Sequence, residues 1–447
     1  MRIAAGAWYA LGVMTLIHAC HYLDRAVIPN LVEPIRREFQ LSDAKLGALT
    51  GLAYGVSFAL AGLPLGYLAD RIDRRRLLSV LLLVWSGLTA CAAASHHYWT
   101  LLITRLGVGA AEAGTTPVAM SMIVDLFPAR SRSTALGIYC IGISIGALLN
   151  AVVAAVIAAH YGWRWAVFAA GVPGTALGLL AWATLKDVPR GSRDASDPGQ
   201  TFVNETFPVG LELARFFLRQ TTLIGLIVAI ALAGAGVSAI AAWLPALLMR
   251  SHGASLAEAG VLTALAYGLF PSVGAVAGGI IADRLARRAR SVQLQLCAGS
   301  TLLAGLAGIG VATFTDLHVV AAAACLAAVS GFALVPPGFG TALGLMPPQM
   351  RAMTTAATQL TANLVGYGLG PYAVGLLSSA LGGSRSLGVG MMIVNVVAMS
   401  IATLLFVVLS HRKEIACCPR GTVSFSHSHA TSQPEDLTRA GTAGLKP

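Results

Sequence analysis

Charged side chains are scarce in this chain of 447 residues. Asp, Glu, Lys and Arg make up only 11% of it, whereas 56% of its residues are hydrophobic. An average soluble domain carries about 25% charged residues, and a water-soluble fold of this length needs more polar surface than these residues supply. Lipid solvates an apolar exterior directly. The composition therefore excludes a soluble globular protein and indicates a membrane protein.

Cysteine is also sparse, and its positions exclude two further classes of site. None of the seven cysteines has the spacing of a disulfide framework or a zinc site. Gly142 to Gly146 matches the hydrolase pattern G-x-S-x-G, but it lies in an apolar run without the strand and turn which that chemistry needs. No nucleophile with a matching base is evident. We therefore expect no enzyme, no metal and no other cofactor.

Long apolar runs, in contrast, are abundant. A hydrocarbon core about 30 Å thick requires roughly 20 apolar residues per helix. Backbone N–H and C=O groups must pair within their own segment in lipid, so such runs are predicted to be α-helices. The twelve predicted spans cover residues 7–29, 45–68, 77–96, 98–124, 133–158, 165–186, 220–248, 257–282, 291–313, 318–345, 352–379 and 386–410.

The net charge of +11 indicates membrane orientation rather than a nucleic-acid partner. If the N-terminus is cytoplasmic, 22 of the 30 Lys and Arg residues lie on the cytoplasmic side and six lie outside. The remaining two, Arg25 and Arg105, lie within spans. This distribution is the positive-inside bias. It predicts an integral protein of the plasma membrane, the bacterial inner membrane, with both termini cytoplasmic.

The chain contains an internal duplication. Residues 66–71 and 279–284 share the pattern Gly-x-x-Ala-Asp-Arg, so that Asp70 aligns with Asp283, and each copy follows the second span of a set of six. In secondary transporters such a repeat places the binding site between the two halves. The predicted parts are an N-terminal half at 1–186, a cytoplasmic linker at 187–219, a C-terminal half at 220–410 and a disordered cytoplasmic tail at 411–447.

Four ionisable residues fall within the predicted spans, namely Asp24, Arg25, Arg105 and Glu112. An ionisable residue at the bilayer midplane costs roughly 2.5–3.5 kcal/mol by insertion scales and usually serves function. Asp24 and Arg25 project about 100° apart on a helix, so each needs a partner elsewhere. Arg105 and Glu112 are two turns apart on one face and can point into one cavity. The alternative is a buried salt-bridge cluster that only fixes helix packing.

The duplicated loop resembles the signature loop of the major facilitator superfamily, and the resemblance runs over nearly the whole chain. Within that superfamily the chain is similar to the Spinster-like group. The matching stretches are residues 21–25, 105–114, 121–128, 243–245 and 366–371 with Asn363. The resemblance implies an all-α bundle of twelve helices in two pseudo-symmetric six-helix halves, which moves its substrate by alternating access.

The resemblance also implies roles for the buried charges. Arg25 would contact an anionic substrate or headgroup, and Glu112 with Asp24 would take up and release a coupling proton. When an arginine leaves a carboxylate to engage an anion, the carboxylate can take a proton, which links substrate to proton. The helices that carry these charges line the central cavity in this superfamily, so all four charges, Arg105 included, would form one network.

By the same resemblance, the two signature loops act as a gate. Their residues are Gly66, Asp70, Arg71 and Arg74 in the first copy, and Gly279, Asp283 and Arg284 in the second. Asp70 would face the N-terminal end of the eleventh span, where the helix dipole favours an anion, and Arg74 would pair with Asp125. Asp283 would lie near the start of the fifth span. Asp73 stands where the signature usually has glycine, which leaves the loop geometry open.

Four further residues are candidates for the cavity wall. His21 shares a helix face with Arg25, so it could tune the charge cluster or simply pack. Trp243, Asn363 and Tyr367 could line the C-terminal side of the cavity, and helix packing explains each of them equally well.

Three functions are compatible with the sequence. The first is proton-coupled transport of a small organic or amphiphilic anion of the lysolipid type, by a monomer that meets only this substrate and membrane lipids. The second is symport of small carboxylates such as sugar acids or aromatic acids. The third is a membrane sensor or scaffold without transport activity, which requires the buried charges to be dispensable.

Overall fold

A computed structural model of the chain describes residues 5–69, 71–127, 129–186, 220–286, 290–346, 351–383 and 385–412. The predicted linker at 187–219 lies outside these residues, as does the predicted tail beyond residue 412. Throughout the described part, all regular secondary structure is helical.

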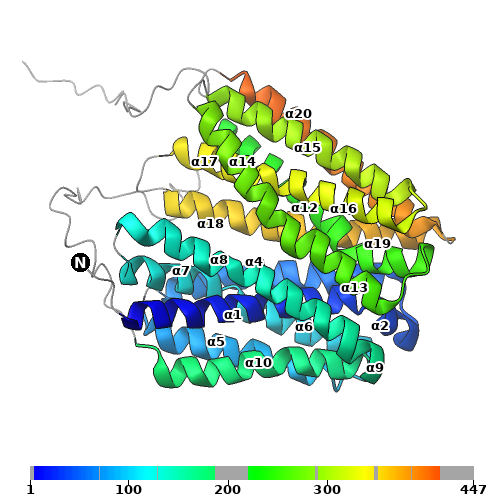
Figure 1. Cartoon of the computed structure of the whole chain (residues 1–447), viewed down its shortest axis with the longest axis horizontal. Helices are drawn as coiled ribbons and strands as arrows, with labels where there is room; N and C mark the ends of the chain where they lie inside the picture. Colours follow the sequence, from blue (N-terminus) through cyan, green and yellow to red (C-terminus); the bar gives the residue numbers. More distant parts are fainter. Residues whose placement is uncertain are drawn as a thin grey trace, which may run out of the picture.

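The helices that precede the predicted linker form one bundle, which is blue to green-cyan in Figure 1. Asp73 begins α5, because its side chain accepts a hydrogen bond from the backbone N–H of Arg76. The helices are α1 (Ala5–Asn30), α2 (Val32–Phe39), α3 (Asp43–Gly47), η1 (Ala48–Leu52), α4 (Ala53–Ala69), α5 (Arg74–Ala92), α6 (Tyr98–Glu112), α7 (Thr115–Leu126), α8 (Ala129–Val152), η2 (Val153–Ala158), α9 (Ala159–Tyr161) and α10 (Trp163–Thr184).

A second bundle follows, which is green to orange in Figure 1. Ser255 and Glu258 begin its α13 with reciprocal side-chain to backbone hydrogen bonds. The helices are α12 (Thr221–Ser251), α13 (Leu256–Ala264), η3 (Leu265–Leu269), α14 (Phe270–Ala286), α15 (Arg290–Thr313), α16 (Leu317–Ala333), α17 (Val335–Gly344), α18 (Arg351–Thr361), η5 (Ala362–Leu369), α19 (Gly370–Leu381) and α20 (Ser386–Ser410).

Ten helical segments of the described part are long and apolar enough to cross a membrane. They coincide with ten of the predicted spans. The other two predicted spans, 7–29 and 98–124, are occupied by α1 and by α6 with α7, which a turn at Ala113 and Gly114 separates. These two segments carry the four ionisable residues Asp24, Arg25, Arg105 and Glu112.

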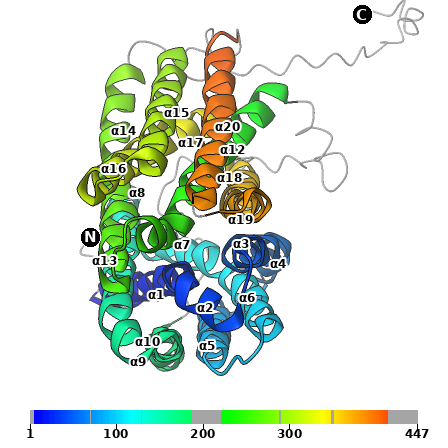
Figure 2. The same ribbon diagram turned by 90° about the vertical axis from the view of Figure 1, so that its right-hand side faces the viewer.

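In the described part of the chain, four π-helical turns lie where the two bundles meet. These are η1, η2, η3 and η5, one in each of the second, fifth, eighth and eleventh spans. In contacts that cross between the bundles, η1 and α4 pack against η5, while α8 and η2 pack against η3 and α13. Figure 2 shows α3 beside α19 and α13 beside α8 along this boundary. A π turn widens a helix locally and occurs frequently at functional sites, so the boundary between the bundles is the place to seek function.

Glycines allow the backbones of the two bundles to touch. A Cβ on Gly51 would lie 2.6 Å from the carbonyl oxygen of Gly368, and a Cβ on Gly55 would lie 2.7 Å from the Cα of Gly368. Small residues permit this close approach, and van der Waals packing then stabilises the contact where the lipid supplies little hydrophobic driving force. A Cβ on Gly62, further along the same helix, would meet nothing within 4 Å.

Candidate functional site

Asp24 and Arg105 form a buried ion pair within the first bundle. Arg105, on α6, donates from Nη1 to Oδ1 of Asp24, on α1, at 3.3 Å. Thr89, on α5, donates to the other carboxylate oxygen of Asp24 at 2.5 Å. Both charged side chains are buried. Asp24 therefore pairs with a different helix and not with its neighbour Arg25, as the helical projection of the sequence predicts.

Glu112 lies in a separate group on the same side of α6. Its side chain is 0% exposed. Tyr54 donates from its hydroxyl to Oε2 of Glu112 at 2.6 Å, and Nε2 of His21 lies 3.0 Å from the same oxygen. Among the described residues, the other oxygen, Oε1, has no hydrogen-bond partner. Nε2 of His21 and Oε2 of Glu112 are therefore within hydrogen-bonding distance, and the carboxyl group retains an unused acceptor.

Arg25 reaches from the first bundle to the second. Its Nη2 donates to Oδ1 of Asn363 at 3.3 Å, and its guanidinium lies 3.7 Å from the ring centre of Tyr367. The ring of Tyr54 lies 5.1 Å from the guanidinium on the side of the first bundle. Within the described residues, Arg25 forms no ion pair with a carboxylate. Its positive charge faces an amide oxygen and two aromatic rings, and it is less buried than Asp24.

Tyr54 joins the groups around Arg25 and Glu112, and sequence reasoning missed it. Its hydroxyl contacts Glu112 and lies 3.4 Å from Nε2 of His21, while its ring lies near the guanidinium of Arg25. The guanidinium of Arg105 is 5.7 Å from the same ring. The residue sits in an apolar span and carries no charge, so composition and periodicity gave no sign of it. The signal available in the sequence was its place between Gly51 and Gly55, because small residues at this spacing predict close contact with another helix.

The structure places the remaining candidate wall residues in two regions. Asn363 and Tyr367 contact Arg25, and His21 contacts Glu112. Trp243 lies elsewhere, because its fully buried side chain packs between α12 and α19 and donates from Nε1 to the carbonyl oxygen of Pro371 at 2.9 Å. Trp243 is thus part of the packing inside the second bundle and is not brought beside Arg25.

The first signature loop contains the expected ion pair. Arg74 donates from Nη1 to Oδ2 of Asp125 at 2.7 Å, and both side chains are buried. Arg71 is exposed and lies 4.0 Å from the ring centre of Tyr67. A Cβ on Gly66 would meet nothing within 4 Å. The position of Asp70 lies outside the described residues.

The second signature loop is described only in part. A Cβ on Gly279 would be in ordinary contact with Pro336, at 3.7 Å, and the side chain of Arg284 is exposed. The side chain of Asp283 is outside the described part of the structure, so its predicted place near the fifth span stays a prediction.

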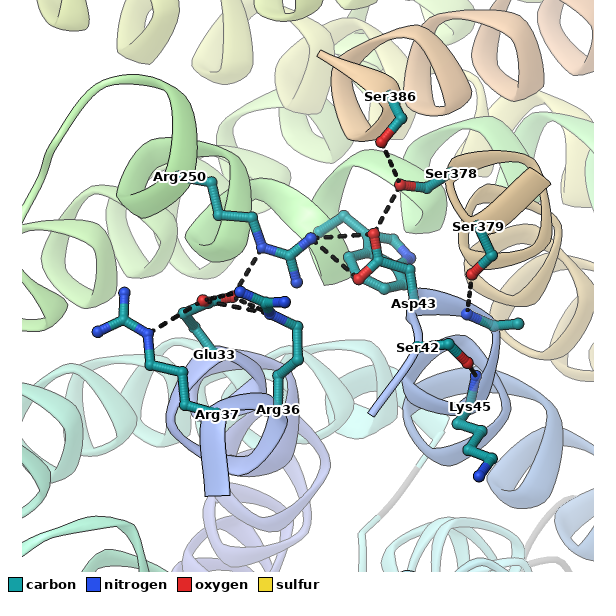
Figure 3. A network of polar contacts seen from close by, with 12 residues as sticks. Glu33, Arg36, Arg37, Ser42, Asp43, Lys45, Arg250, Ser378, Ser379 and Ser386 are labelled. Carbon is teal, nitrogen blue, oxygen red and sulfur yellow. Dashed lines mark hydrogen bonds and ion pairs between the residues drawn. The ribbon is translucent and has the colours of Figure 1, made fainter. Parts of the chain in front are cut away.

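At the opposite end of the bundles from the signature loops, Arg250 clamps the two halves together (Figure 3). From α12, Arg250 donates through Nε to Oε2 of Glu33 at 2.7 Å and through Nη1 to both oxygens of Asp43 at 2.9 Å. Ser378, on α19, also donates to Asp43, at 2.6 Å. We call Glu33, Asp43 and Arg250 the Arg250 clamp. In the sequence, Arg250 is recognisable only as one of the six external positive charges.

Glu33 stays ionised in this clamp. Burial alone would raise the pKa of Glu33, but hydrogen bonds from Arg36 and Arg250 outweigh burial and hold the pKa of that carboxyl below its usual range. Arg37 donates a further hydrogen bond to the same side chain at 3.2 Å. The clamp is therefore a charged contact at neutral pH, and charge-assisted hydrogen bonds hold the two bundles together at this end, which we call the closed end.

The sequence profile of the Major Facilitator Superfamily matches residues 14–371. The chain belongs to this superfamily. It is 29% identical over 385 residues to an MFS-type efflux pump of Mycolicibacterium smegmatis, with 86% of this chain and 87% of that protein covered. It is 24% identical over 398 residues to the sphingosine-1-phosphate transporter SPNS2 of Danio rerio, with 83% of this chain and 76% of that protein covered.

The fold of this superfamily member also matches a solved structure. A bacterial homologue of the human lysosomal transporter Spinster, in an inward-facing and unoccupied conformation, superposes with a TM-score of 0.81 at 26% identity, over 91% of this chain and 97% of that chain. These likenesses confirm the all-α fold of the superfamily and place the chain in its Spinster-like group. The protein is thus an integral membrane transporter, and the fold and relatives are not those of an enzyme.

Proposed function

We propose that this superfamily member moves an amphiphilic organic anion across the membrane by alternating access and couples the movement to a proton. The observation that carries the proposal is the environment of Arg25. Its guanidinium lies at the boundary of the two bundles and, among the described residues, faces an amide oxygen and ring planes but no carboxylate. Such a group is well suited to bind a carboxylate or phosphate in surroundings largely screened from water.

The aromatic rings around Arg25 support an amphiphile as substrate. Tyr54 and Tyr367 offer apolar faces on either side of the guanidinium, so a charged headgroup and an attached apolar chain both find partners there. A relative that bears the name of sphingosine-1-phosphate transporter supports the same substrate class, an anionic headgroup on an apolar chain.

Glu112 is the proposed proton carrier. Asp24 already accepts from Arg105 and Thr89, which satisfies it as a carboxylate. Glu112 instead shares one oxygen between Tyr54 and His21, and its second oxygen has no partner among the described residues. The proton would pass between Oε2 of Glu112 and Nε2 of His21, with Asp24 and Arg105 holding the helices around them.

The proposed orientation puts both termini in the cytoplasm and the Arg250 clamp on the external side of the plasma membrane. The distribution of Lys and Arg supports it. The likeness to an inward-facing structure supports it too, because contact between the bundles at the external end leaves the cytoplasmic side for substrate exchange. In the transport cycle, the clamp would open as the signature loops close.

Uptake into proteoliposomes tests this function, with and without an imposed pH gradient. We expect Glu112→Gln to abolish accumulation driven by the gradient while sparing substrate binding, because glutamine keeps the shape and hydrogen bonding of the side chain but cannot exchange a proton. We expect Arg25→Ala to weaken binding itself. If the Glu112→Gln protein still concentrates substrate as the parent does, Glu112 has no coupling role.

The substrate panel should contain a lysophosphatidate and a sugar acid such as galactonate. Gradient-driven uptake of the lysophosphatidate supports the amphiphilic anion. Uptake of the sugar acid alone would replace the proposal with symport of small carboxylates. Transport of neither, together with full tolerance of Arg25→Ala and Glu112→Gln, would favour a sensor or scaffold.

A further inference from the structure

Tyr54 contacts both Arg25, the proposed anion site, and Glu112, the proposed proton site. Its hydroxyl donates to Glu112 at 2.6 Å, and its ring lies 5.1 Å from the guanidinium of Arg25. The side chain is almost fully buried, at 2% exposure. No other described side chain is shown in contact with both the proposed anion site and the proposed proton site.

The backbone at Tyr54 is held on two sides. A Cβ on Gly109, in α6, would lie 2.8 Å from the carbonyl oxygen of Tyr54, so α4 and α6 are in backbone contact just where α6 carries Glu112. On the other side, the Cβ of any side chain at Gly55 would collide with Gly368 in η5, the turn that carries Tyr367. Movement of η5 relative to α4 therefore changes what surrounds the Tyr54 ring, while the contact with α6 stays within one bundle.

We propose that Tyr54 is the positioning residue that transmits occupancy of Arg25 to Glu112. An anion bound by Arg25 draws the guanidinium away from the ring face of Tyr54, and the freed ring withdraws its hydroxyl from Glu112. A donated hydrogen bond stabilises a carboxylate, so its loss favours uptake of a proton. Substrate binding and protonation are then coupled through one side chain. This inference rests on the proposed function, since it needs an anion at Arg25 and a proton at Glu112.

The charges that face Glu112 define what else contributes to its protonation. His21 on α1 lies nearest, and Asp24 and Arg25 on the same helix act over a longer distance. Arg105 lies two turns away on α6 itself. Within the described part of the chain, only Tyr54 both donates to Glu112 and contacts the proposed anion site, so removing its hydroxyl isolates the proposed link.

Tyr54→Phe is the decisive variant, because phenylalanine keeps the ring beneath Arg25 and removes only the hydroxyl. Tyr267→Phe is the matched control, since its buried hydroxyl has no hydrogen-bond partner among the described residues. Lysophosphatidate binding to the purified full chain would be measured at about pH 6 and pH 8, together with the protons taken up on binding. Parent, Tyr54→Phe, Tyr267→Phe and Glu112→Gln proteins would be compared.

We expect the parent and Tyr267→Phe proteins to bind at least about fivefold more tightly at the lower pH and to take up a proton, in the usual range of coupling between sites. Tyr54→Phe keeps the ring that faces Arg25 and should lose most of the pH dependence and proton uptake, as Glu112→Gln does. If Tyr54→Phe keeps the parent's pH dependence while Glu112→Gln loses it, Tyr54 is not the link. If binding is lost at both pH values, Tyr54 belongs to the anion site, and the coupling role is overturned. A parent without pH dependence would refute the proposed function itself, and the role of Tyr54 with it.

Discussion

The ionisable side chains of α1 and α6 divide into an ion pair, Asp24 with Arg105, and a second set, Arg25 and Glu112. Asp24 and Arg105 neutralise one another, and Thr89 completes the coordination of the carboxylate. Among the residues that the structure describes, Arg25 and Glu112 have no such opposite charge within hydrogen-bonding distance, apart from His21 when it is protonated. Loss of one partner from a buried pair leaves an uncompensated charge, whereas an incompletely paired charge is free to bind a ligand or a proton.

Removal of Arg105 should destabilise the protein more than it impairs binding. Arg105→Gln leaves Asp24 as an unpaired buried carboxylate, which we expect to lower the free energy of unfolding by about 3–5 kcal/mol. The double variant with Asp24→Asn removes both charges and should recover most of this loss. Detergent-induced unfolding of the purified proteins measures both effects. A double variant as unstable as Arg105→Gln alone would contradict a structural pair.

At the scale of elements, two contacts close one end of the boundary between the bundles. The glycines of η1 and α4 pack against η5, and the Arg250 clamp lies nearer the end of the helices. Backbone contact of this kind tolerates no side chain, and a charged clamp holds only while its partners are ionised. The glycine contact should therefore be sensitive to an added side chain, and the clamp should be sensitive to the loss of a charge.

Gly55→Ala should lower the population of the form in which the two bundles touch at the closed end. The added methyl group would lie 2.7 Å from the Cα of Gly368, so the helices must separate or distort. Gly62→Ala, on the same helix with nothing within 4 Å, is the control. Spin labels at the exposed positions His96 and Arg385 would report the separation of the bundles at this end. An unchanged distance distribution in Gly55→Ala would show that the close contact does not limit closure.

Arg250→Gln should open the same end. The substitution removes three charge-assisted hydrogen bonds to Glu33 and Asp43, each of which contributes roughly 1.5–3 kcal/mol. We expect at least about a tenfold change in the ratio of closed to open forms, read from the same labels. Arg164→Gln provides the control, because Arg164 at this end pairs with Glu38 inside the first bundle. If Arg164→Gln changed the ratio of closed to open forms as much as Arg250→Gln, the Arg250 clamp would have no special role in closure.

Acid should also open the clamp, but only at low pH. Burial raises the pKa of Glu33, but hydrogen bonds from Arg36, on the same helix, and from Arg250 bring it below its ordinary value of 4.5. Only the bond from Arg250 is lost when the clamp opens, so the open form binds the proton more readily. The contribution of Glu33 to closure is therefore complete above pH 4.5 and is lost as the pH falls through the lower pKa of the closed form. The label distances should stay constant from about pH 8 to pH 5. A transition near neutral pH would indicate control by a histidine instead.

At the scale of the whole molecule, the proposed orientation makes one direct prediction. Arg385→Cys, next to the clamp end, should react with a membrane-impermeant maleimide in intact cells, whereas Arg76→Cys, in the first signature loop, should react only after permeabilisation. Both positions are exposed, and the native cysteines would be replaced in both proteins. The reverse pattern would overturn the assignment of both termini to the cytoplasm.

Membrane insertion, the helical spans and the duplication were all readable from the chain, because they depend on local composition and on patterns that repeat along it. The same holds for the separate partners of Asp24 and Arg25, since 100° of helical rotation is a local property. The identity of those partners was decided only by the packed bundles. Asn363 meets Arg25 across more than 300 residues, and Tyr54 reaches Glu112 through the rotation of two helices about their axes. Hydrophobic periodicity does not specify such rotation in helices that are apolar on every face, so tertiary packing alone assembled the site and the Arg250 clamp.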